Sequence, residues 1–192
     1  MSVRQPEVLS YGGTRPARRG VRVTIAALAV LMVLLAGSDQ WLRHREFLTL
    51  LTGVESGQSA VTYADGRVRS MVQYTYPLVI SIRTSPEVRE GLRRLVQDAA
   101  AERVPALRER RNAVARLSIL PWHTAQRRAL TAYVAYLDAR VAYLEAIADR
   151  FGQLFVAHPE LQRRMAVARA ALLAAAPWPG DAESADRILP AS

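Results

Sequence analysis

The chain has 192 residues, of which 51% are hydrophobic, and its formal net charge is +9. It contains no cysteine, which excludes disulfides, thiolate metal sites, thiol nucleophiles and a lipidated cysteine. All 26 basic residues are arginine, which we interpret chiefly as the codon bias of a GC-rich bacterial genome. The positive charge is therefore carried by guanidinium groups, which bind carboxylates and phosphates in a bidentate manner.

The beginning of the chain is rich in glycine and proline and poor in apolar residues. We predict that residues 1–20 form a disordered cytoplasmic tail. The run that follows, from Val23 to Ala36, contains no charged residue. A transmembrane helix needs about 20 apolar residues. The run reaches this length over residues 21–42 if Arg22 extends its side chain toward the headgroups and Trp41 lies at the interface.

Residues 21–42 are therefore predicted to be a transmembrane signal anchor. Its determinants are the flanking arginines, the apolar run and the interfacial tryptophan, namely Arg18, Arg19, Arg22, Val23, Leu28, Leu31, Leu34, Leu35 and Trp41. More arginines precede the run than follow it, so we expect the N-terminus in the cytoplasm and the C-terminal domain outside the plasma membrane. The alternative is a cleaved signal peptide, because Ala36-Gly37-Ser38 offers small residues for cleavage before Asp39 and secretion.

Residues 60–83 are compatible with two structures. Val72 to Ile82 alternate with period two, and Asp65-Gly66 could turn a hairpin, which gives an α+β alternative. Pro77 would confine such a strand to the edge of a sheet. We favour a helix, because the neighbouring predicted helices need a helical surface to pack against.

Three further helices are predicted after this region. The first begins at Ser85-Pro86-Glu87, where serine can cap, proline fits the first turn and glutamate complements the helix dipole. Pro105 is expected to kink or divide this helix. Residues 119–124 are expected to form a turn that plugs one end of a bundle. The last helix begins in the same manner at His158-Pro159-Glu160.

The middle helix shows the strongest pattern. Apolar residues alternate at spacings of four and three, as in a heptad repeat, and give a predicted helix seam of Leu130, Val134, Leu137, Val141, Leu144, Ala148, Phe151 and Phe155. Asp138 and Glu145 lie beside the seam, where we expect them to pair with arginines of the preceding helix. Three tyrosines are interpreted as its amphipathic rim, namely Tyr133, Tyr136 and Tyr143. A seam this regular leaves homo-oligomerisation open.

These elements predict an all-α fold. A single transmembrane helix is followed by an extracytoplasmic antiparallel helical bundle over residues 43–176. Residues 177–192 contain three prolines and several acidic residues, so we predict that they form a disordered tail.

No residue pattern predicts catalysis. The sequence has no Gly-x-Ser-x-Gly elbow and no phosphate-cradling glycine loop, and its three histidines lack metal-ligand spacing. We interpret His123 as part of the plug and both His44 and His158 as exposed. We therefore predict no catalytic residues, no cofactor, no metal and no enzymatic activity.

Residues 86–128 hold ten arginines and five acidic residues. A candidate basic contact surface is formed by Arg103, Arg108, Arg110, Arg111 and Arg116. It is interpreted first as a solvated face that Glu90, Asp138 and Glu145 partly neutralise. The alternatives are contact with anionic lipid headgroups or an envelope polyanion, and contact with an acidic protein. We expect no nucleic acid, because no aromatic residues interleave the basic run.

The sequence thus predicts a single-pass bacterial membrane protein whose extracytoplasmic bundle binds protein or envelope partners in a scaffold or accessory role. The alternative is a ligand-sensing bundle that works through a membrane partner. A pocket lined by unpaired polar groups would favour sensing, whereas an interior of aliphatic side chains alone would favour a scaffold.

Overall fold

The computed structural model describes residues 17–81 and 84–189, with side chains from Val23 onward. This part of the chain contains helices and no strand, so the all-α prediction is confirmed. Its elements are α1 (Ala17–Val79), α2 (Pro86–Ala115), α3 (Thr124–Asp149), the 3-10 helix η1 (Phe151–Phe155), α4 (Pro159–Ala175) and α5 (Pro179–Ile188). The hairpin alternative for residues 60–83 is wrong where the structure describes them, because α1 continues to Val79.

The chain divides into two compact units, Met1–Gln40 and Trp41–Ser192. In the first unit, α1 is long and apolar enough to cross a membrane. Its large apolar side chains are exposed, from 51% at Leu31 to 71% at Val33. A continuous apolar surface of this kind is unfavourable in water and is typical of a helix that contacts lipid or a partner.

The predicted anchor lies mostly in this first unit. The backbone of Arg18, Arg19 and Arg22 belongs to α1, although their side chains are outside the described part. The predicted tail over residues 1–20 is helical from Ala17, and its residues 1–16 lie outside the described residues.

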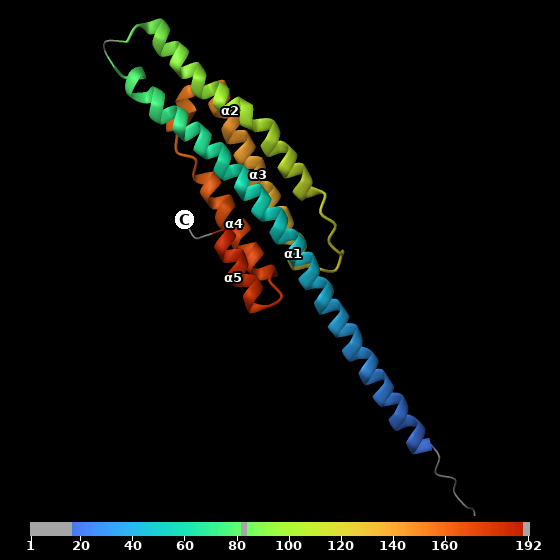
Figure 1. Cartoon of the computed structure of the whole chain (residues 1–192). Helices are drawn as coiled ribbons and strands as arrows, with labels where there is room; N and C mark the ends of the chain where they lie inside the picture. The colour runs from blue at the N-terminus through green and yellow to red at the C-terminus, as the bar shows by residue number, and fades with distance from the viewer. Residues whose placement is uncertain (1–16, 82–83, 190–192) are drawn as a thin grey trace, which may run out of the picture. The chain divides into compact units, whose positions relative to one another are not determined.

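The second unit is a bundle in which α1, from Trp41 onward, packs with α2, α3 and α4 (Figure 1). α3 runs parallel to α1, since contacts advance together along both helices: His123 with Glu46, Tyr133 with Val54, and Arg140 with Asp65. α2 and α4 run antiparallel to α3, as short connections require. α5 packs on α4.

α1 contributes to the core a stripe whose spacings alternate between three and four residues. The stripe consists of Phe47, Leu50, Val54, Gly57, Val61, Ala64 and Val68, all of them buried. Two of its members, Gly57 and Ala64, have little or no side chain. They leave space in which larger side chains of a neighbouring helix can pack.

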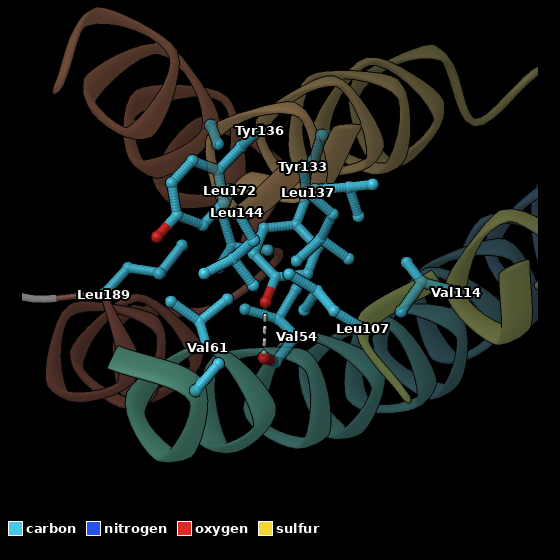
Figure 2. Packing of buried hydrophobic residues seen from close by; sticks show 14 of the residues in the cluster. Val54, Val61, Leu107, Val114, Tyr133, Tyr136, Leu137, Leu144, Leu172 and Leu189 are labelled. Atoms are coloured by element: carbon cyan, nitrogen blue, oxygen red, sulfur yellow. Dashed lines mark hydrogen bonds between the residues drawn. The ribbon is translucent and has the colours of Figure 1, made fainter. Parts of the chain in front are cut away.

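The first half of α3 packs against the core with a different face from the one that the heptad predicts. Tyr133 and Tyr136 are buried, so their assignment to the rim is wrong. The hydroxyl of Tyr133 donates a hydrogen bond to the carbonyl oxygen of Val54 at 2.8 Å (Figure 2), and its ring lies against Gly57. A buried tyrosine is stable when its hydroxyl finds such a partner, and here the glycine provides the space.

The predicted seam is therefore only partly in the core. Leu137, Val141 and Leu144 are buried. Three other positions are partly buried against the core, namely Leu130, Val134 and Ala148. α3 ends at Asp149 because the next residue has an extended backbone, so Phe151 and Phe155 lie in η1 and do not continue the seam.

The helix starts that were predicted from capping patterns are confirmed. The Ser85 hydroxyl accepts the backbone N–H of Val88 at 3.4 Å, Pro86 is the first residue of α2, and Pro159 begins α4. Pro105 lies inside α2, which continues on both sides of it. The proline therefore does not divide the helix.

The tail that was predicted to be disordered contains α5. Ala185 and Leu189 are buried, and the Arg169 guanidinium of α4 donates to the carbonyl oxygen of Leu189 at 3.0 Å and pairs with Asp186. These tertiary contacts stabilise a segment whose composition alone indicates disorder. The prediction is wrong for Pro179–Ile188, and residues 190–192 lie outside the described part.

Gly57→Ala tests the packing between α1 and α3. An added Cβ would lie 2.6 Å from Tyr133 Oη and 3.1 Å from Tyr133 Cε1. Because the ring is buried and hydrogen-bonded, it can move only by disturbing the core. We expect Gly57→Ala to lower the free energy of unfolding by about 1–3 kcal/mol, measured by urea denaturation of the full chain in detergent and followed by circular dichroism.

Gly66→Ala is the matched control in the same helix. Nothing lies within 4 Å of the Cβ that it adds, and alanine favours helix over glycine by up to about 1 kcal/mol. This substitution should leave the free energy of unfolding unchanged or raise it. Equal effects of the two substitutions would contradict the packing of Tyr133 against Gly57.

Candidate functional site

An open pocket of about 470 Å³ lies in the bundle among α1, α3, η1 and α4. Its volume is within the range of small-molecule binding sites. Its lining combines apolar side chains with charged and polar ones. The pocket belongs entirely to the unit that begins at Trp41.

The apolar part of the lining comes from all four elements. Val68 of α1 and Leu144 of α3 are core residues and are buried. Val72 and Leu161 are partly buried, and Phe155 of η1 is exposed at the edge. This surface can cover a ring or a short hydrocarbon chain, because burial of apolar area is favourable and needs no specific geometry.

The charged part of the lining consists of two arginines and one aspartate. Arg140 of α3 forms an ion pair with Asp65 of α1, and its side chain is only 13% exposed. Its guanidinium carbon also lies 5.6 Å from the centroid of the Tyr143 ring. The face of an aromatic ring attracts a cation at this distance. Arg69 lines the pocket one helical turn further along α1. It forms no ion pair with any described residue. The three groups therefore leave an excess of one positive charge.

Two polar groups stand beside this charge. The Tyr143 and His158 rings meet edge to face, with centroids 4.8 Å apart. His158 Nε2 lies 3.2 Å from the carbonyl oxygen of Gln153; since a carbonyl can only accept, this nitrogen carries the proton. Burial raises the pKa of the Tyr143 hydroxyl, so it stays protonated at neutral pH and can donate a hydrogen bond.

The arrangement is suited to binding an amphipathic anion. Guanidinium and hydroxyl donors can hold one carboxylate, sulfonate or phosphate group, and the apolar residues can hold the remainder of such a molecule. Among the described residues, no group of three or more histidine, aspartate or glutamate side chains could hold a metal ion. The pocket lining contains neither serine nor cysteine.

The acidic residues predicted to pair with α2 do so. Asp138 accepts two hydrogen bonds from the Arg111 guanidinium, at 2.7 and 3.1 Å, and Glu145 pairs with Arg108. All four side chains are partly exposed. The expectation that Asp138 and Glu145 neutralise the basic helix is confirmed.

These ion pairs neutralise part of the charge of the candidate basic contact surface. Arg103 is also engaged, because it pairs with Glu102 at 2.8 Å and lies 4.7 Å from the centroid of the Tyr63 ring. Arg110 and Arg116 are exposed and form no ion pair with any described residue. Only these two of the five predicted contact residues therefore offer an unneutralised charge.

The three histidines have different surroundings. His123 is buried, but Trp122 beside it is 60% exposed, so the predicted plug is only partly correct. His123 Nδ1 lies 2.6 Å from Glu46 Oε2. His44 and His158 are partly buried and not simply exposed, and His44 Nδ1 lies 2.9 Å from Asp181 Oδ2. The sequence did not single out the pocket, because its residues on α1 lie far along the chain from those on the consecutive elements α3, η1 and α4.

No protein-family model matches this chain, and neither a curated protein nor a solved structure shows detectable similarity to it. A proposal about function therefore depends on the residues and geometry described above.

Proposed function

We propose that this protein is a single-pass plasma-membrane protein whose extracytoplasmic bundle binds a small amphipathic anion without transforming it. The observation that carries the proposal is the pocket, where Arg69 and Arg140 face apolar side chains and only Asp65 balances them. In this reading the bundle is a ligand-sensing input and works through a membrane partner.

The membrane location rests on the first unit. α1 has the length and composition of a spanning helix, and its apolar side chains are covered by nothing else among the described residues. The orientation rests on the arginines that precede the span, since positive residues are retained on the cytoplasmic side.

A scaffold or accessory role is the second candidate. It is favoured by Arg110 and Arg116, whose exposed charges could contact an acidic partner. It is weakened because Arg108 and Arg111 are already paired with acidic residues of α3. Exposed ion pairs of this kind contribute little stability, but they do cancel the local charge that would attract a partner.

The ligand proposal can be tested with 2-naphthoate, titrated by calorimetry into the full chain in lipid nanodiscs. We expect the imidazole resonances of His158 to shift on binding, because this ring lines the pocket. Arg69→Gln should weaken binding by about tenfold or more, since it removes a hydrogen bond to a charged group. The uncharged analogue 2-naphthamide should bind more weakly.

Arg67→Gln provides the matched control. Arg67 is also an exposed arginine of α1 but does not line the pocket, so its substitution changes the net charge equally and should leave the affinity unchanged. Equal losses in the two variants would attribute binding to overall charge. Binding of 2-naphthamide as tight as that of 2-naphthoate would exclude the proposed anion site.

The topology can be tested independently of the ligand. Since the chain has no cysteine, one introduced thiol is a unique reporter. Thr62 is exposed on α1, and Thr62→Cys should react with a membrane-impermeant maleimide added to intact spheroplasts. Ser2→Cys should react only after lysis. The reverse pattern would place the bundle in the cytoplasm, and a shortened Thr62→Cys product in the medium would indicate cleavage and secretion.

A further inference from the structure

The three tryptophans of the chain are all exposed in the second unit. Trp41 is 55% exposed, Trp122 is 60% exposed and Trp178 is 42% exposed. They come from three separate places: the beginning of the unit on α1, the connection between α2 and α3, and the residue before α5. Exposed apolar side chains indicate a contact with something outside the bundle where they gather on one surface.

Contacts with α1 bring these three places to one end of the bundle. The ring of Trp178 lies against His44, with centroids 4.1 Å apart. Trp122 precedes His123, whose Nδ1 lies 2.6 Å from Glu46. The connections that carry Trp122 and Trp178 lie at the same end in Figure 1.

The contact points occupy a short length of α1. Residues 41 to 46 span about 7.5 Å along a helix axis. The headgroup layer on each side of a bilayer is about 5–8 Å thick. Tryptophan prefers this layer, because its ring is apolar and its N–H needs a polar partner. The length of α1 that holds the three tryptophans is therefore about equal to the thickness of one headgroup layer.

The same end of the bundle is rich in arginine. Four arginines belong to the segments that meet there, namely Arg45, Arg116, Arg127 and Arg128. The carboxylates of these segments are largely engaged within the bundle: Glu46 accepts from the backbone N–H of Leu120 at 2.9 Å as well as contacting His123, and Asp181 contacts His44. The surface presented outward is therefore positive, and near an anionic membrane each arginine contributes about 1 kcal/mol of attraction.

We propose that this end of the bundle, formed by the three tryptophans and these four arginines, lies in the headgroup layer of an anionic bilayer. We call it the tryptophan collar. Trp41 directly follows the unit that contains the candidate membrane span, so the chain itself brings the collar to the surface of the same membrane. The inference uses the membrane span and is independent of the ligand pocket.

Tryptophan quenching tests the collar in the full chain, reconstituted into vesicles of phosphatidylcholine and phosphatidylglycerol. Each variant keeps one tryptophan and has phenylalanine at the other two positions. A phospholipid spin-labelled near its headgroup should quench Trp122 and Trp178 as well as Trp41, and aqueous iodide should quench them weakly. If Trp178→Phe alters the helix content, Trp178→Tyr keeps a hydrogen-bond donor as well as a ring beside His44.

The control places the only tryptophan at Tyr74, which is 67% exposed and lies near the opposite end of α1. Tyr74→Trp should be quenched several-fold more by iodide than by the labelled lipid. The proposed position of the collar in the headgroup layer is wrong if Trp122 and Trp178 are quenched in the same way as Tyr74→Trp. It is equally wrong if both quenchers fail to reach them, because another protein or a second copy would then cover this face.

Two double variants test whether the arginines help to hold the collar at an anionic membrane. Arg127→Gln/Arg128→Gln should increase iodide quenching of Trp122, and the increase should disappear in vesicles of phosphatidylcholine alone. Arg93→Gln/Arg94→Gln removes the same charge from α2, where both arginines contact Glu90 at 3.6 Å, and should have no effect. Equal effects of the two pairs would exclude recognition of anionic lipid by the collar.

Discussion

The packing of Tyr133 against Gly57 fixes the register of the bundle. A buried hydroxyl requires an acceptor, and the carbonyl oxygen of Val54 provides one at 2.8 Å. Because α1 and α3 run parallel, this contact also aligns the residues on either side of it. Arg140 reaches Asp65 about two helical turns further along, and in the other direction His123 reaches Glu46. A different register would separate both pairs.

The same register keeps two chemically different regions apart. The pocket uses α1 from Asp65 onward, whereas the tryptophan collar uses α1 up to Glu46, which is at least about 28 Å away along the helix. A ligand and a membrane surface could thus be bound at the same time. Cleavage before Asp39 would leave the core intact, since its first residue is Phe47. The pocket would survive such cleavage, but the collar would lose the helix that is proposed to attach it to the membrane.

Local patterns were predicted well because their physical causes are local. The starts at Ser85-Pro86-Glu87 and His158-Pro159-Glu160 depend on capping and on proline in the first turn, so the sequence shows them directly. The ion pairs of Asp138 and Glu145 followed from helical spacing. The face of the first half of α3 was predicted incorrectly, because the heptad placed the tyrosines at the rim and could not show that Gly57 leaves space for Tyr133.

Features that depend on tertiary contacts escaped prediction. α5 has the composition of a disordered tail and is stabilised by Arg169 of another helix, and the pocket combines residues from four elements.

Native-state amide hydrogen exchange on the full chain tests most directly whether α1 and α3 share one core. We predict that the amides from Phe47 to Thr75 exchange with the same high free energy of opening as those of α3, since one cooperative unit opens together. Exchange of this part of α1 at a much lower free energy than α3 would contradict the account.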